Sequence, residues 1–139
     1  MRKRSIAVML AAGCLGAQAA TALWQPVPGA PEMQVDTGSL EAQGSLVTAW
    51  VRLAGSSQVL RGAAFEPGGT LPPHHRRVVE AQVDCHRRTV RTLGSQALDT
   101  RGRPVYMATV PGRALPLPAD EGLGWLYDAL CELARARAQ

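Results

Sequence analysis

Two cysteines, Cys85 and Cys131, constrain what this chain can fold into more than any other feature of the sequence. Cys85 lies in a segment that alternates like a β-strand, and Cys131 lies in a segment with helical spacing. We therefore predict a disulfide bond between them, which would fasten the C-terminal helix to a β-sheet. Because the loop between them is long, closing it removes unfolded-state entropy worth about 3–4 kcal/mol.

The N-terminal segment has the three parts of a secretory signal peptide. Residues 2–4 are positively charged, and residues 5–15 are almost wholly apolar but too few to span a bilayer. Residues 17–19, Ala-Gln-Ala, fit the small-residue cleavage rule, and residues 20–22 form a second candidate. We expect residues 1–19 to be removed, with cleavage after residue 22 as the alternative.

The cysteine at position 14 leaves a second route of export open. Residues 11–14, Ala-Ala-Gly-Cys, place Cys14 after a small residue, as in a lipid-attachment box, although Leu is usual where Ala11 stands. Cleavage after Ala19 would instead leave two cysteines, an even number in an oxidising compartment, which favours a structural disulfide. We expect export to the periplasm or the outer-membrane surface, with a lipoprotein attached through Cys14 as the minority alternative.

The positive charge of the chain belongs mostly to this prefix. The formal net charge is +4, but removal of residues 2–4 reduces 15 basic residues to 12, against 11 acidic ones, and the net charge to +1. All the remaining cations are arginines. A nearly neutral chain gives no argument for nucleic-acid or membrane binding. We also expect no transmembrane helix after processing.

Alternation with a period of two predicts a small antiparallel β-sheet of about five to six strands. The clearest strand is Leu46 to Leu53, whose one face is wholly apolar and whose other face carries Trp50 and Arg52. Residues 78–88 and 89–98 are expected to form a hairpin. The other predicted strands are residues 32–36 and 104–110, and the proline-interrupted start at residues 23–27 cannot be an inner strand.

One amphipathic helix is expected at the C-terminus, where Leu123, Leu126, Leu130 and Leu133 recur at helical spacing. These elements predict an α+β fold, in which an antiparallel sheet packs against one C-terminal helix and carries one disulfide, as a single domain over residues 20–139. Residues 54–77 are rich in glycine and proline and show no period, which predicts a flexible loop.

No motif for catalysis, a metal ion or a cofactor is visible. The histidines are His74, His75 and His86, and their spacing does not form a ligand set. There is no nucleophile elbow and no glycine loop that could hold a phosphate in a strand–helix context. We therefore expect no catalytic residue, no metal and no cofactor.

Arginines are densest around the predicted strand at residues 78–88. Arg76, Arg77, Arg87, Arg88 and Arg91 could form one basic edge, suited to sulfated glycans or acidic protein surfaces. The same charges could equally protect a solvated strand edge against aggregation. The sequence leaves both interpretations open.

Several landmarks follow one another in a recognisable order along the chain. They are Trp24, Asp36 and Ser39, Val47 with Trp50 and Val51, Asp84-Cys85-x-x-Arg88, Gly102 and Cys131. This order resembles the surface-adhesin protein E family of Gram-negative bacteria. The resemblance covers nearly the whole chain after the signal peptide, and it implies a small exported protein with an antiparallel sheet, a C-terminal helix and a disulfide.

The resemblance also implies a non-enzymatic role at the cell surface, because adhesive members of the family bind host extracellular-matrix components and plasminogen. Two features depart from the family pattern: the segment at residues 54–77, and the absence of lysine after the signal peptide, since lysine is the side chain that kringle modules favour. We expect an extracellular-matrix protein or an acidic glycan as the partner, and a homodimer remains open. The alternative is a periplasmic structural or envelope-stress protein.

Overall fold

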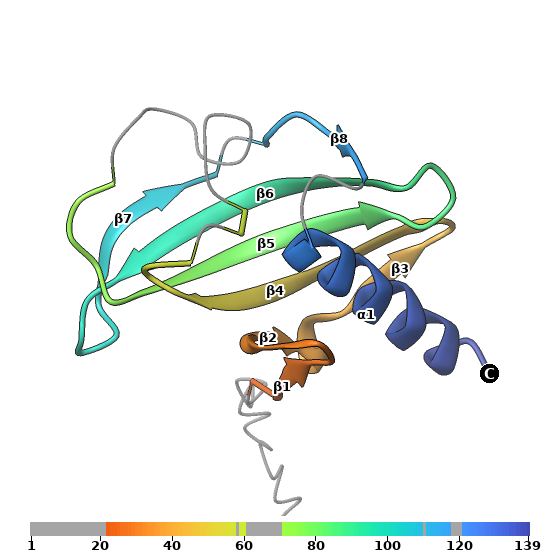
Figure 1. The fold of residues 1–139 in the computed structure, drawn as a ribbon, viewed down its shortest axis with the longest axis horizontal. Coiled ribbons are helices and arrows are strands. Elements are labelled where there is room, and N and C mark those ends of the chain that lie inside the picture. Colours follow the sequence, from red (N-terminus) through yellow and green to blue (C-terminus); the bar gives the residue numbers. More distant parts are fainter. Residues whose placement is uncertain (1–21, 58, 61–70, 110, 118–120) are drawn as a thin grey trace, which may run out of the picture.

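The computed structural model of the chain consists of one β-sheet with one helix across one of its faces (Figure 1). It describes residues 22–57, 59–60, 71–109, 111–117 and 121–139. The predicted signal peptide, including Cys14, lies outside the described residues, as do residues 58 and 61–70 of the predicted loop at residues 54–77. In the described part of the chain, no helix has the length and apolarity needed to cross a membrane.

The sheet has eight strands, all of them paired antiparallel. Six strands form its continuous path, in the order β1-β2-β4-β5-β6-β7, while β3 pairs with β4 and β8 pairs with β6. The elements are β1 Trp24–Val27, β2 Ala30–Asp36, a 3₁₀ turn at Thr37–Ser39, β3 Glu41–Gln43, β4 Leu46–Ala54, β5 Arg76–Asp84, β6 Thr89–Leu98, β7 Pro104–Ala108, β8 Leu115–Pro116 and the helix α1 Glu121–Arg137.

The predicted α+β fold is confirmed, and the expected five to six strands correspond to the continuous path. The structure adds two short strands, β3 and β8. The sequence predicted only an extended connector where β8 lies, because a two-residue strand is too short to show a period. The proline-containing β1 pairs only with β2 and ends the path, as expected for a strand with missing donors.

Alternation along β4 and β5 creates the core face of the sheet. Val47 pairs with Val83 and Val51 pairs with Val79, and all four side chains are buried. The residues between them point to the opposite face and are only partly buried. The predicted division of β4 into an apolar core face and a second face with Trp50 is therefore confirmed.

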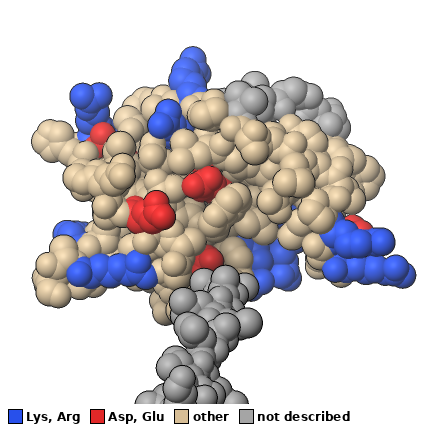
Figure 2. All heavy atoms as spheres, turned by 180° about the vertical axis from the view of Figure 1, so that it is seen from behind, with Lys and Arg blue, Asp and Glu red and all other residues tan. Residues whose placement is uncertain are grey.

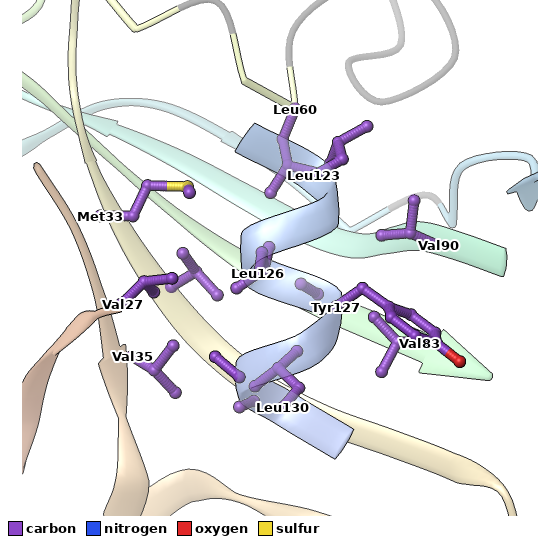
Figure 3. Close-up of a cluster of buried hydrophobic side chains, with 14 of the residues drawn as sticks. Val27, Met33, Val35, Leu60, Val83, Val90, Leu123, Leu126, Tyr127 and Leu130 are labelled. Carbon is purple, nitrogen blue, oxygen red and sulfur yellow. The ribbon is translucent and has the colours of Figure 1, made fainter. Parts of the chain in front are cut away.

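The helix α1 covers this core face with the leucines that the sequence placed on one side (Figure 3). Leu123, Leu126 and Leu130 are at most 1% exposed, whereas Leu133 is half-buried at the margin. Each fully buried leucine contributes about 1.5–3 kcal/mol through the hydrophobic effect. The helix is thus held to the sheet mainly by this apolar stripe.

The last turn of α1 is fixed to the turn region before β3. The guanidinium of Arg137 donates to the carbonyl oxygen of Leu40 at 3.0 Å and also to the carbonyl of Thr37. Arg135 lies in the same last turn, where positive charge complements the helix dipole. Residues about one hundred positions apart are therefore joined at the C-terminal end of the helix.

Several predicted boundaries were wrong. The strand expected at residues 78–88 begins earlier and ends earlier, because β5 comprises Arg76–Asp84 and a turn follows it. The loop expected at residues 54–77 is correspondingly shorter. Its first residue, Ala54, pairs with Arg76, which extends the β4–β5 ladder to the ends of both strands.

Candidate binding surface

The face of the sheet that α1 does not cover is open. We call it the open face, and it consists of the outward residues of β4, β5 and β6, with their neighbours on β1 and β2. Figure 2 views the molecule from this side and shows a mostly uncharged surface, with acidic groups near its middle and arginines towards its margins. An antiparallel sheet with one covered and one solvated face is a common arrangement, and it leaves the open face available for contact.

A hollow of about 320 Å³ lies on the open face, where β4 ends and β5 begins. Trp24, Arg52, His75, Arg76 and Asp99 are among the residues that line it. These residues come from four separate parts of the sequence, which the sheet brings together. Two of the five are permanently charged cations, and these two are neighbours across the β4–β5 ladder.

The register of the ladder explains why Arg52 and Arg76 are neighbours. Arg52 pairs with Val78, and Ala54 pairs with Arg76, so the two arginines are diagonal neighbours on one face. Diagonal side chains of an antiparallel pair lie about 7–8 Å apart at the backbone, which is within reach of long side chains. The two guanidinium groups therefore share one region of the open face.

The guanidinium of Arg52 is held on two sides. Its Nε donates to Oε1 of Gln34 at 2.8 Å, and its Nη2 donates to the same oxygen. Its carbon Cζ lies 4.6 Å from the centroid of the Trp24 ring, a cation–π contact. Burial lowers the pKa of Arg52, and the neighbouring charge of Arg76 lowers it further. The effect of Arg76 on the pKa of Arg52 means that the two cations repel each other.

The structure does not bring the predicted basic edge together. Arg76 lies at the start of β5, a strand of nine residues, while Arg87 and Arg88 lie in the turn that follows its other end. Arg91 lies on β6 and donates to Gln82 at 2.9 Å. Moreover, β5 is an inner strand between β4 and β6, so it has no free edge.

Arg77 is the clearest correction, because it does not reach the surface. Its side chain is 1% exposed and points to the core face. Its guanidinium donates to the carbonyl oxygens of Ser57, Val59 and Leu60, at 3.2, 2.7 and 3.0 Å. Arg77 therefore organises the segment after β4 and cannot contact a partner.

Trp24 and Arg52 are the functional candidates that the basic-edge prediction missed. A signal for Arg52 was present, since the alternation of β4 places it beside Trp50 on the face away from the core. Nothing in the sequence placed Trp24 near it, because that contact depends on the pairing of β2 with both β1 and β4.

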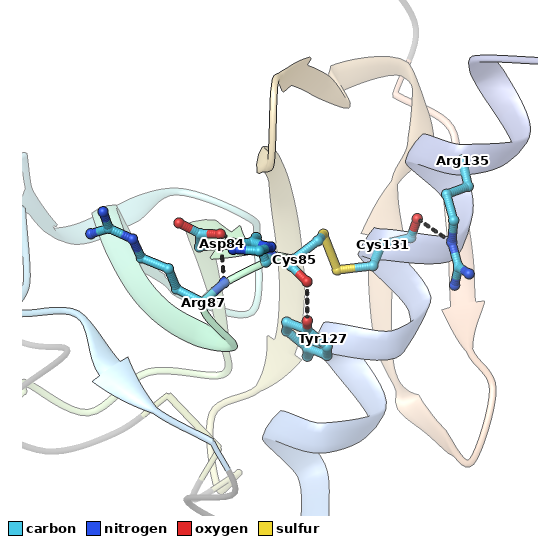
Figure 4. Close-up of a disulfide and its surroundings, with 7 residues drawn as sticks. Asp84, Cys85, Arg87, Tyr127, Cys131 and Arg135 are labelled. Atoms are coloured by element: carbon cyan, nitrogen blue, oxygen red, sulfur yellow. Dashed lines mark hydrogen bonds between the residues drawn. A yellow bond between two sulfur atoms is a disulfide. The ribbon is translucent and has the colours of Figure 1, made fainter.

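The predicted disulfide is confirmed at the other end of the sheet (Figure 4). Cys85 and Cys131 are separated by 46 residues, and their Cα atoms lie 5.9 Å apart. The phenol of Tyr127 donates to the carbonyl oxygen of Cys85, and the ring faces the guanidinium of Arg88 at 5.1 Å. This end of the molecule is therefore cross-linked and structurally rigid.

The turn that carries Cys85 is shaped by Asp84. Its Oδ1 accepts hydrogen bonds from the backbone N–H groups of Arg87 at 2.9 Å and His86 at 3.0 Å. The hydrogen bond from the backbone of Arg87 is the main cause of a lowered pKa at Asp84, and the hydroxyl of Ser45 also contributes. Burial acts in the opposite direction but is outweighed.

The three histidines do not converge. His74 and His75 precede β5, whereas His86 follows it, so they lie at opposite ends of that strand. Within the ranges that the structure describes, no three His, Cys, Asp or Glu side chains form a group that could hold a metal ion.

Comparison with known proteins identifies the fold. No protein-family model and no curated protein sequence matches this chain. Two solved structures of protein E from Haemophilus influenzae are similar to it. One, crystal form II, has a TM-score of 0.57 at 10% sequence identity and covers 78% of this chain and 87% of that chain. The other, the selenomethionine form, has a TM-score of 0.56 at 12% identity and covers 78% and 85%. The chain therefore has a protein E-like fold.

Proposed function

We propose that this protein is an exported, non-enzymatic binding module, and that the open face of its sheet contacts an acidic glycan. The observation that carries this proposal is the division of the sheet into two unlike faces. One face is filled by α1, while the other presents partly exposed Trp50 together with Arg52 and Arg76. A rigid sheet with exposed aromatic and arginine side chains is suited to binding without catalysis.

Three further features support the proposal. The N-terminal segment has the pattern of a signal peptide, and the Cys85–Cys131 disulfide is typical of exported proteins. Both cysteines are used in that bond, so neither thiol is free for chemistry. The protein E-like fold adds a scaffold that the sequence resemblance connects with surface binding, although a fold by itself does not determine a function.

The first test concerns export. The full chain should be expressed in a Gram-negative host. The cells should then be fractionated, and the mass of the intact protein should be measured. We expect material that lacks residues 1–19 and has two hydrogens fewer than its reduced form. An acylated N-terminal cysteine would instead identify the lipoprotein, and cytoplasmic full-length chain would contradict export.

The second test concerns the surface that binds. Binding to immobilised heparin should be measured for the exported protein, with Trp50→Ala on the open face and Trp125→Ala on the helix side as a matched pair. Trp125 is 46% exposed and Trp50 is partly exposed, so both substitutions remove an indole that solvent can reach. We expect Trp50→Ala alone to weaken binding.

Three results would count against this function. Equal effects of the two substitutions on heparin binding would show that the open face is not the binding surface. Tighter binding to an extracellular-matrix protein than to heparin would replace the glycan with a protein partner. Periplasmic retention without binding to either would favour the structural or envelope-stress role.

A further inference from the structure

We propose that the hollow at the β4–β5 end of the open face is an oxyanion-binding site, and that it takes a sulfate group of an acidic glycan. The hollow is lined by Arg52, Arg76, Trp24 and His75. The glycan part of this inference rests on the function proposed above, whereas the oxyanion site stands on the geometry of the hollow itself.

The first requirement for such a site is a cation that is already fixed in position. Gln34 accepts two hydrogen bonds from Arg52, and the ring of Trp24 covers one face of its guanidinium. In the described part of the chain, Nη1 of Arg52 has no hydrogen-bond partner and the group forms no ion pair. A positioned donor loses little side-chain entropy when an anion binds.

The second requirement is a second donor of the same sign beside it. Arg76 is the diagonal neighbour of Arg52 and lines the same hollow. Its guanidinium forms neither a hydrogen bond nor an ion pair with another described residue. Two guanidinium groups together match the oxygen atoms of sulfate, because each can donate two parallel N–H bonds.

The two positive charges also carry a cost that an anion would remove. The charge of Arg76 lowers the pKa of Arg52, after the larger effect of burial. This repulsion persists because no carboxylate within the described ranges forms an ion pair with either arginine. A bound oxyanion would neutralise the hollow and relieve the repulsion.

Asp99 is the acidic residue in the lining, and its charge is already compensated. Its carboxylate accepts from Nε of Arg103 at 3.1 Å, and from the backbone N–H groups of Arg101 and Arg103 at 2.8 and 2.9 Å. The hollow therefore keeps an excess of positive charge from Arg52 and Arg76.

The experiment compares two double variants that lose the same charge. Arg52→Gln with Arg76→Gln removes both cations of the hollow. Arg87→Gln with Arg113→Gln removes two exposed arginines that lie away from the hollow, near the start of β6, where Thr89 and Thr92 lie. Circular dichroism and thermal unfolding establish that both variants fold.

Titration calorimetry should use a sulfated heparin octasaccharide, the same octasaccharide after desulfation, and inorganic sulfate. We expect the sulfated form to bind the exported protein, and the loss of both hollow arginines to weaken binding about tenfold or more, since hydrogen bonds to charged groups are strong. The control pair should retain nearly the original affinity. Inorganic sulfate should compete with the octasaccharide but bind more weakly.

Each contrary result overturns a defined part of the inference. Equal weakening in both double variants would show non-specific charge attraction and overturn the site. Octasaccharide binding that survives the loss of Arg52 and Arg76 would overturn the site but leave the proposed function standing. Sulfate that binds as tightly as the octasaccharide would overturn the glycan as ligand. No binding of any probe would overturn both the site and the glycan-binding function.

Discussion

The phenolic oxygen of Tyr127 donates a hydrogen bond to the carbonyl oxygen of Cys85, with 2.8 Å between the two oxygens. Cys131 lies four residues further along α1, on the same side of the helix, and forms the disulfide with that same Cys85. The turn after β5 is thus attached to the helix by one covalent bond and one hydrogen bond (Figure 4). These two attachments differ in strength, so they can be tested separately.

Removal of the disulfide should destabilise the fold without changing it. Cys85→Ala with Cys131→Ala opens a loop of 46 residues, and we expect the free energy of unfolding to fall by about 2–4 kcal/mol. Tyr127→Phe should cost only about 1 kcal/mol, because it removes a single neutral hydrogen bond. Urea denaturation measures both. A reductant should lower the midpoint of the original protein and leave the double variant unchanged; an equal response of the two would contradict the assignment.

The strands and the helix were predictable because their signals are local. The alternation of Val47, Val51 and their neighbours identified the core face of β4, and the leucine spacing identified the buried side of α1. The pairing of Cys85 with Cys131 followed from a count of cysteines. Each of these inferences needs only the period of one segment or the chemistry of one compartment.

The binding surface was less predictable because it depends on register. Arg76 and Arg77 are adjacent and chemically identical, yet they point to opposite faces of β5, one to the hollow and one to the core. The proximity of Arg52 to Arg76 requires the β4–β5 pairing, which no short pattern specifies. Grouping arginines by their proximity in the sequence therefore placed Arg77, which is buried, together with arginines at the surface.

The buried guanidinium of Arg77 provides a second prediction. Arg77→Met would leave the carbonyl groups of Ser57, Val59 and Leu60 without their donor, so we expect the free energy of unfolding to fall by about 2–4 kcal/mol. Arg76→Met is the matched control on the open face and should change stability by less than about 0.5 kcal/mol. Chemical denaturation distinguishes them. Similar losses from both substitutions would contradict the opposite orientation of the two side chains.

Gly29 should be more sensitive to substitution than Gly44. Both have a positive φ, +86° and +59°, so alanine costs about 1–2 kcal/mol at either position. A Cβ at Gly29 would also lie 2.5 Å from the ring of Trp125, whereas nothing lies within 4 Å of one at Gly44. Gly29→Ala should therefore be the more destabilising by thermal denaturation. That difference should shrink in a Trp125→Ala background, and its persistence there would contradict the steric explanation.

Two aspartates should make the fold sensitive to acid. Hydrogen bonds from the backbone, chiefly from Arg87 to Asp84 and from Arg103 to Asp99, lower the pKa of each carboxyl group in the folded chain. The unfolded value is about 3.9, so the charged carboxylates stabilise the fold fully above that pH. This stabilisation is lost as the pH falls below about 4 and through the lower folded pKa.

The matching variant is Asp84→Asn combined with Asp99→Asn, which keeps an acceptor oxygen at each position but removes the titration. The urea midpoint, measured from pH 6 down to about pH 2, should fall less steeply for this variant than for the original chain. The steepness below about pH 4 is informative because both carboxylates are ionised above it. If the urea midpoints of the variant and the original chain fell equally steeply below about pH 4, the two turns would not contribute to the pH dependence of folding.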